Sequence, residues 1–310
     1  MSDHVVIVAA KRTPVGAFMG ALSGATAVQL GAAAIKGALE DAGLAGKDVQ
    51  EVIMGCVLPA GLGQAPARQA ALAAGIPVGT PATTINKMCG SGLKAIMMAA
   101  DQIRAGDIDI AVAGGLESMS NAPYLLPKAR AGMRMGHGEV LDHMLYDGLQ
   151  SPFDGQLMGC FADNTADKYK FTRAEQDEFA AESTRRAMRA VEAGDFAAEV
   201  VSVTVKSRKG ETVVEKDETP YNVDLAKIPK LKAAFRKDGT VTAASSSSIS
   251  DGAAAVVLMS EKAALARGLK PLARIVGYAS HAHEPEWFTT APSGAIKKML
   301  DRLQWRADQV

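Results

Sequence analysis

The residue of this chain best suited to covalent chemistry is a cysteine in the glycine-rich segment Asn86–Ala95. Cys89 follows an apolar, strand-like approach and opens a stretch whose apolar residues have helical spacing. Backbone N–H groups at a helix start lack partners within the helix, and the helix dipole there favours negative charge. Because the thiolate is the reactive form of cysteine, the pattern predicts an acyl-accepting nucleophile, with Gly90 and Gly92 leaving room for a substrate.

Two other interpretations of this segment stay open. A free cysteine is often simply a small buried hydrophobic residue that does no chemistry. In addition, Gly90, Gly92 and Ala95 fit the loose pattern G-x-G-x-x-A of dinucleotide-binding proteins, with Asp107 and Asp109 downstream as the acidic residues that would contact a ribose. That pattern normally opens the first strand–helix turn of its domain, whereas here it follows a long strand–helix region, which argues against a nicotinamide enzyme.

Length and composition narrow the class of protein. A chain of 310 residues predicts about two domains. Lys plus Arg and Asp plus Glu number 34 each, and this balance argues against nucleic acid or an anionic membrane as the partner. The apolar run Val5–Ala10 is too short for a signal segment or a membrane span. Three scattered cysteines without a C-x-x-C pair predict neither disulfides nor a zinc site, and we expect a cytoplasmic protein.

Strand and helix signals alternate at the start of the chain, which predicts an α/β fold with a mostly parallel sheet covered by helices on both faces. The alternation of strands and helices stops near residue 120, and we therefore expect an inserted domain there. One clear helix is expected within it, over Arg173–Ala193, with Thr172 and Glu175 as its capping box. The expected strands lie at 5–8, 52–57, 82–85, 108–115 and 253–259, and the other helices at 28–42, at 66–74 and after Cys89. The predicted domains are residues 1–119 with 245–270, the insertion 120–244, and the start of another domain at 271–310.

An internal repeat relates the two ends of the chain. Residues 34–41 resemble residues 295–302 without a gap, and each copy follows a β-rich run, at 5–9 and at 273–278. The first copy leads into a strand, whereas the chain ends before the equivalent strand of the second copy. Half a unit would leave a sheet edge and apolar helix faces uncovered. We therefore expect either a truncated chain or a partner surface supplied from elsewhere.

Several long motifs, in order, resemble those of the thiolase family, the acetyl-CoA acetyltransferases and 3-ketoacyl-CoA thiolases. The resemblance runs from the first strand, with Arg12-Thr13-Pro14, to Val310, and its other motifs lie at 63–70, 86–95, 114–123 and 239–255. It implies a thiolase-like fold, with two similar α/β halves, the second incomplete here, and an inserted loop domain that binds CoA. It also implies a homodimer or homotetramer, acetyl-CoA and 3-ketoacyl-CoA as partners, coenzyme A as a substrate, no other cofactor and no metal.

The resemblance further implies a ping-pong reaction of fatty acid metabolism. Cys89 would take an acyl group from a 3-ketoacyl-CoA or from acetyl-CoA and pass it to CoA, or to the enolate of a second acetyl-CoA. The carried-over CoA contact is Ser247, with Ala243 and Met158 lining the pantetheine slot. Leu157 stands where many short-chain members have histidine, which counts against acetoacetyl-CoA specificity. The N–H of Cys89 would contribute to an oxyanion hole, where charge builds on the thioester oxygen.

Departures from the family pattern bear on activity. The histidine, second cysteine and water-binding asparagine of the family would lie beyond Val310, and no histidine here occupies the family position. We expect His137 and His143 to be solvated loop residues. General acid–base catalysis is worth about 10²–10⁴-fold, so the chain alone is expected to be nearly inactive. The alternative is a non-catalytic thiolase-like fragment that binds CoA or a protein partner.

Two smaller departures concern CoA binding. Four serines at 245–248 replace the family's Asn-Ala-Ser segment, which changes the expected turn. Tyr221 stands where a basic residue often meets the 3′-phosphate, and Lys227 or Lys230 would be the substitutes.

Overall fold

The structure is a computed structural model that describes residues 4–208 and 210–310. The described chain forms two compact units. Unit 1 consists of the described residues of Met1–Gly148, Arg189–Asn222 and Ser248–Ile275, and unit 2 consists of Leu149–Met188, Val223–Ser247 and Val276–Val310. These units do not follow the domain boundaries expected from the sequence, and those boundaries stay a prediction.

Unit 1 is built on a seven-stranded sheet with the strand order β11-β1-β10-β5-β3-β4 and with β2 paired to β10. The strands are β1 (Val5–Arg12), β2 (Gly16–Ala17), β3 (Glu51–Gly55), β4 (Ala82–Ile85), β5 (Ile110–Ser118), β10 (Ser250–Ser260) and β11 (Ala273–Arg274). Apolar residues fill β1, β3, β5 and β10 because both faces of the sheet are covered there, as the continuous runs in the sequence predicted.

The expectation of a mostly parallel sheet is wrong. Only the pairings of β3 with β4 and with β5 are parallel, whereas β1, β5 and β2 pair with β10 in antiparallel fashion. The reason is the path of the chain: β10 returns after the long insertion and enters the sheet between β1 and β5 in the opposite direction. Ala255 therefore lies opposite Lys11 on one side and Gly114 on the other.

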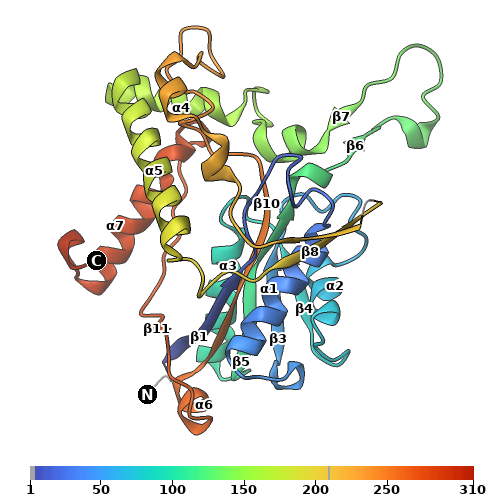
Figure 1. The fold of residues 1–310 in the computed structure, drawn as a ribbon, viewed down its shortest axis with the longest axis vertical. Helices are drawn as coiled ribbons and strands as arrows, with labels where there is room; N and C mark the ends of the chain where they lie inside the picture. The colour runs from blue at the N-terminus through green and yellow to red at the C-terminus, as the bar shows by residue number, and fades with distance from the viewer. Residues whose placement is uncertain (1–3, 209) are drawn as a thin grey trace. The chain divides into compact units, whose positions relative to one another are not determined.

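Helices cover both faces of this sheet (Figure 1). α1 (Ala27–Asp41) and α2 (Pro66–Ala73) pack together on one face, and α3 (Ser91–Ala105) packs against β3, β5 and β10 on the other; α6 (Glu261–Ala266) follows β10. In α1 the fully buried residues Leu30, Ala34, Ile35 and Ala38 recur at helical spacing, which gives the helix one apolar face. The helices expected at 28–42 and 66–74 are thus confirmed to within one residue at each end.

The start of α1 carries a capping box that the structure makes testable. Thr26 Oγ1 accepts the N–H of Gln29 at 3.2 Å, and the Gln29 side chain accepts the N–H of Thr26 at 2.8 Å. We expect Thr26→Ala to lower the free energy of unfolding by about 1 kcal/mol, because it leaves helix-end N–H groups without a partner. Urea denaturation of both proteins measures this difference, and equal midpoints with equal slopes would contradict the prediction.

Two hairpins complete unit 1. β6 (Tyr124–Leu125) and β7 (Leu141–Asp142) form a projecting arm, and β8 (Val203–Ser207) pairs with β9 (Gly210–Val214) (Figure 1). Val203, Val205 and Val214 of the second hairpin belong to the same hydrophobic core as α1 and the sheet. The short helical turns are Gly46–Asp48, Met119–Asn121, Ala129–Ala131, Met144–Leu149 and Thr219–Asn222.

Unit 2 is mainly helical. Its helices are α4 (Met158–Tyr169), the first part of α5 (Arg173–Ala193) and α7 (Ala291–Leu303), with shorter turns at Leu225–Lys230, Pro285–Thr290 and Ala307–Gln309. The expected bounds of α5 are confirmed, and so is its capping box: Thr172 N–H donates to Glu175 Oε2 at 2.8 Å, and Glu175 N–H donates to Thr172 Oγ1 at 3.2 Å. Phe161 of α4 packs edge-to-face on Phe288, with 6.4 Å between ring centroids.

Both copies of the sequence repeat fall within helices, α1 and α7. Their β-rich approaches differ. Residues 5–9 lie in a long strand, whereas only Ala273–Arg274 of the run 273–278 forms a strand, and this short strand pairs with β1.

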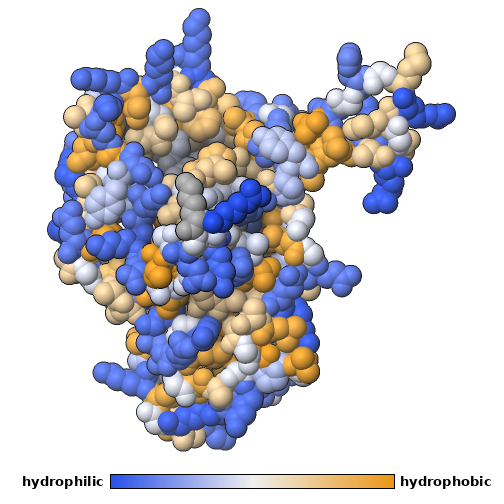
Figure 2. All heavy atoms as spheres, turned by 45° about the vertical axis from the view of Figure 1, so that its right-hand side comes forward, coloured by the Kyte–Doolittle hydropathy of each residue, from blue (hydrophilic) through white to orange (hydrophobic). Residues whose placement is uncertain are grey.

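On the face shown in Figure 2, hydrophilic and hydrophobic side chains are interspersed. No helix among residues 4–208 and 210–310 has both the length and the apolar character needed to cross a membrane.

Candidate active site

Cys89 lies in the connection between β4 and α3. It is exposed, and α3 begins two residues later at Ser91, with Gly90 as its N-cap. The sequence placed Cys89 as the first residue of the helix, so the structure moves it just ahead of the helix start. Cys89 therefore lies just before the N-terminus of α3, where the helix dipole favours a negative charge.

Cys89 lines a cavity of about 290 Å³ in unit 1. The ends of β3 and β5, the start of α3 and the start of β10 meet here, and the lining residues are Gly55, Val57, Met88, Cys89, Ser91, Gly92, Gly115, Leu116, Glu117, Gly252, Ala253 and Ala254. Many of these residues are glycine or alanine, so few large side chains project from the wall into the cavity. Among these lining residues only Cys89 and Glu117 are titratable, so any charge on the described wall comes from these two groups.

Hydrogen bonds fix the backbone before Cys89. Ser91 Oγ accepts the N–H of Lys87 at 2.8 Å and donates to the carbonyl of Met88 at 2.6 Å, while Asn86 Oδ1 accepts the N–H of Met88 at 2.9 Å. Met88 itself has a φ of 49°, in the left-handed region. A side chain with a Cβ is strained there by about 1–2 kcal/mol, so the surrounding bonds must hold Met88 in place.

Glu117, at the end of β5, is a residue that the sequence reasoning missed. Its carboxylate accepts the N–H of Val57 at 2.8 Å and that of Leu58 at 3.0 Å, and Cys56 Sγ lies 3.6 Å from Oε1. Burial raises the pKa of this carboxyl, and the two backbone N–H groups oppose the rise. The sequence did contain a signal for Glu117, namely an acidic residue at the end of an expected buried strand. The motif that contains it, residues 114–123, was used only as evidence of resemblance to thiolases.

The raised pKa of Glu117 predicts how stability depends on pH. Above the ordinary value of 4.5 an unfolded glutamate has lost its proton, whereas the folded protein still holds it until its own higher pKa is reached. The stabilisation is therefore full below about pH 4.5 and is lost as the pH rises through the folded-state pKa. We expect wild type to lose stability over this interval relative to Glu117→Gln in urea titrations at stepped pH; parallel pH curves would contradict this.

Cys56 lies next to Glu117 and is buried, whereas Cys89 is exposed. Burial raises the pKa of the Cys56 thiol to about 12, and the neighbouring carboxylate adds to the rise. Since the thiolate is the reactive form, we expect iodoacetamide to modify Cys89 in the native protein and Cys56 only after unfolding. Peptide mapping by mass spectrometry distinguishes the two; native labelling of Cys56 at the rate of Cys89 would refute the assignment.

The expectation that His143 is a solvated loop residue is wrong. Its ring is buried, with Nδ1 at 2.5 Å from Asp147 Oδ2, and Nε2 accepts the N–H of Ala60 at 3.4 Å. The reason is the helical turn that starts at Met144, because a spacing of four residues brings Asp147 back to His143. His137 is exposed, as expected.

The expected CoA contacts lie in unit 2. Leu157 and Met158 form the start of α4, and Ala243 and Ser247 are exposed in the segment that leads to β10. Leu157 and Met158 therefore lie on one segment, and Ala243 and Ser247 lie on another. Their roles in binding CoA stay predictions.

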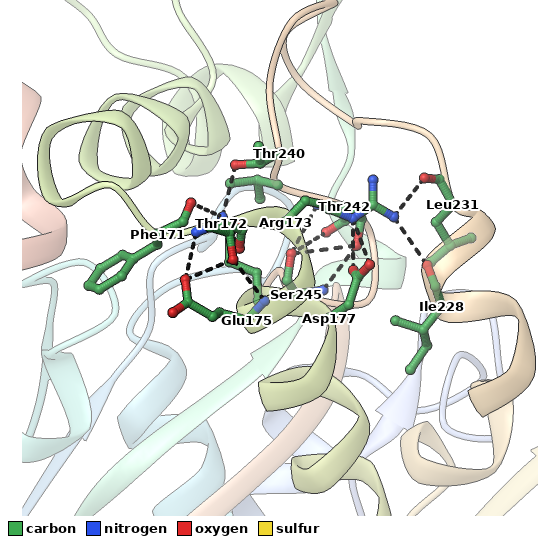
Figure 3. A network of polar contacts seen from close by, with 12 residues as sticks. Phe171, Thr172, Arg173, Glu175, Asp177, Ile228, Leu231, Thr240, Thr242 and Ser245 are labelled. Carbon is green, nitrogen blue, oxygen red and sulfur yellow. Dashed lines mark hydrogen bonds and ion pairs between the residues drawn. The ribbon is translucent and has the colours of Figure 1, made fainter.

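The segment that leads to Ala243 and Ser247 is tied to α5 by a polar network (Figure 3). Gln176 of α5 donates to Thr240 Oγ1 at 2.9 Å, and the N–H of Thr242 donates to Ser245 Oγ at 2.9 Å. At the same helix end, Arg173 pairs with Asp177 at 2.8 Å and donates to two carbonyls of the segment 228–231. Ser245 therefore closes the local turn that the missing asparagine had put in question.

Lys227, one of the two lysines suggested as substitutes near the CoA 3′-phosphate, forms an ion pair with a nearby residue. Lys227 is exposed and pairs with Asp224 at 3.1 Å, and Tyr221 is also exposed. An exposed ion pair of this kind contributes little to stability, so Lys227 can exchange Asp224 for another anion at small cost.

Comparisons with known proteins agree with this geometry. A family model for the N-terminal domain of thiolases matches residues 5–262. The chain is 51% identical to an acetyl-CoA acetyltransferase of Pseudomonas aeruginosa over 310 residues, covering 99% of this chain and 79% of the relative. It is 50% identical over 309 residues to acetyl-CoA acetyltransferase 2 of Arabidopsis thaliana, covering 99% and 77%.

A solved structure extends the likeness to three dimensions. The crystal structure of the Bacillus anthracis acetyl-CoA acetyltransferase superposes with a TM-score of 0.96 at 42% identity, covering 99% of this chain and 78% of that chain. The expected thiolase-like α/β fold is thereby confirmed. The motif order, the glycine-lined cysteine cavity, the family match over 5–262 and this superposition together show that the chain belongs to the thiolase family.

Proposed function

We propose that this thiolase transfers acyl groups through Cys89, cleaving 3-ketoacyl-CoA with CoA or condensing two molecules of acetyl-CoA. The observation that carries the proposal is an exposed thiol at the start of α3, inside a glycine-lined cavity. Relatives at about half identity are named acetyl-CoA acetyltransferases, which supports this substrate class.

The proposed thiolysis has two steps that balance. In the first, the Cys89 thiolate attacks the C3 carbonyl of the 3-ketoacyl-CoA; the C2–C3 bond breaks, and the acetyl-CoA enolate leaves and takes up one proton, which is balanced by the proton that the thiol of free CoA releases when it ionises. In the second, the thiolate of free CoA attacks the acyl–Cys89 thioester and releases the Cys89 thiolate. Each step places a negative charge on a carbonyl oxygen, which the Cys89 N–H would stabilise. Condensation is the same sequence reversed.

The proposed CoA site uses Ser247 as a hydrogen-bonding group for the pantetheine arm, with Ala243, Met158 and Leu157 as its apolar walls. Small and apolar side chains suit a narrow slot for a thin, amide-containing chain. Exposure of Ala243 and Ser247 supports this assignment, because a ligand can reach them. A homodimer or homotetramer, a cytoplasmic location and the absence of any cofactor besides CoA belong to the same proposal.

Thiolysis of acetoacetyl-CoA and of a longer 3-ketoacyl-CoA by the purified chain tests the proposal. Loss of the 3-ketoacyl-CoA enolate absorbance follows each reaction, and the ratio of the two kcat/KM values ranks chain length. Cys89→Ser is measured in parallel, and Cys160→Ser is its matched control, because Cys160 lies in α4 and not among the residues that line the Cys89 cavity. Slow CoA-dependent loss of both substrates at unequal rates is expected, because none of the residues that line the Cys89 cavity is a histidine able to act as a general base. CoA binding without turnover would instead favour a non-catalytic CoA-binding protein.

A further inference from the structure

Glu117 and the strained backbone before Cys89 are connected through the residues that follow β3. On one side of this segment, the Glu117 carboxylate accepts the N–H groups of Val57 and Leu58 at 2.8 and 3.0 Å. On the other side, the N–H of Cys56 donates to the carbonyl of Ile85 at 3.0 Å. The segment 56–58 therefore bridges the end of β5 and the end of β4.

The same segment reaches the nucleophile through one side chain. Asn86 Nδ2 donates to the carbonyl of Val57 at 3.4 Å, and Asn86 Oδ1 accepts the N–H of Met88 at 2.9 Å. Met88 is the residue with φ 49° that immediately precedes Cys89. An uninterrupted series of hydrogen bonds thus runs from the Glu117 carboxylate through Val57 and Asn86 to the strained residue.

We propose that Glu117 is a positioning residue for Cys89: its carboxylate fixes the segment 56–58, which orients Asn86 and so holds Met88 in the conformation that presents the thiol to the cavity. The inference rests on the proposed role of Cys89 as nucleophile. A left-handed residue returns to an ordinary conformation unless its surroundings hold it. Loss of the anchor would therefore move Cys89.

A carboxylate suits this position better than its neutral analogue. Its two oxygens accept two converging N–H groups at once, whereas the amide of Gln has one acceptor oxygen and turns a donor toward the other N–H. Glu117→Gln consequently keeps size and shape and breaks one of the two anchors. The matched control is Glu51→Gln, the same substitution at the first residue of β3, where Glu51 Oε1 lies 3.5 Å from Thr83 Oγ1.

The test combines Glu117→Gln, Asn86→Ala and the double variant, each measured for kcat, KM and the rate at which iodoacetamide alkylates Cys89. We expect each single variant to lower kcat and the alkylation rate by about 10- to 100-fold with little change in KM, since a misplaced reacting group costs that much. The double variant should match the more impaired single variant, because both changes break the same series of bonds. Glu51→Gln should behave like wild type.

Two results would overturn the inference. One is a Glu117→Gln protein that melts at a lower temperature but keeps the wild-type kcat and alkylation rate, which would make Glu117 merely structural. The other is a double variant whose effects multiply, which would make the two residues independent. If Glu117→Gln does not fold, Asn86→Ala alone decides, since Asn86 is exposed: an unchanged alkylation rate refutes the link. Alkylation needs no turnover, so these outcomes stay distinct from failure of the proposed thiolase reaction.

Discussion

Replacement of Cys89 by alanine is expected to reduce kcat/KM for thiolysis by at least about 10⁴-fold, because removal of a covalent nucleophile eliminates the only route through an acyl-enzyme. The loss should fall on kcat, with little effect on CoA affinity, since the expected CoA contacts lie on other segments. Stopped-flow absorbance and calorimetric titration with CoA measure the two quantities.

The comparison needs a control for thiol content. Cys160→Ala removes the partly exposed cysteine of α4 and should leave kcat within about twofold, as expected for a substitution away from the reacting atoms. Equal loss in both variants would show that the effect is one of folding. Retention of activity in Cys89→Ala would exclude the acyl-Cys89 mechanism.

Gly55→Ala is expected to damage both stability and activity. A Cβ at Gly55 would lie 2.5 Å from Ser91 Cβ and 2.9 Å from Gly92 N, so either the end of β3 or the first turn of α3 must shift. Overpacking of this kind costs about 1–3 kcal/mol, and backbone atoms have little freedom to yield. Because Cys89 lies two residues before the first turn of α3, kcat should fall by about 100-fold.

Gly79→Ala is the matched control for this substitution. A Cβ at Gly79 meets no atom within 4 Å, so its free energy of unfolding should change by less than about 0.5 kcal/mol. Urea denaturation and thiolysis rates of both variants decide the matter. A Gly55→Ala protein with the stability and kcat of Gly79→Ala would show that β3 and α3 do not need their close approach.

Regular elements could be predicted well from this sequence because local patterns determine them. The start of α5 follows from the Thr172/Glu175 box, and the buried strands follow from continuous apolar runs. The direction of β10 could not be predicted, because it depends on how the chain returns after an insertion rather than on residues within the strand.

The site divides in the same way. The surroundings of Cys89 could be predicted because its neighbours in sequence, the glycines and the helix start, create them; its role as nucleophile stays a proposal. Glu117 and His143 could not, because their environments come from residues distant in sequence or from an irregular turn: Val57 and Leu58 lie on another strand end, and Asp147 meets His143 only through the turn at Met144. Burial of a charged side chain is a tertiary property that single-residue patterns do not reveal.

The most direct test of the account is to trap the acyl-enzyme. The purified chain is mixed with acetyl-CoA, quenched in acid, digested and mapped by mass spectrometry, with Cys89→Ser treated in parallel. The account predicts one acetyl group on the peptide that contains Cys89, removed when free CoA is added before the quench. Acetylation at another residue, or no acetylated peptide from a chain that nonetheless turns over substrate, would contradict it.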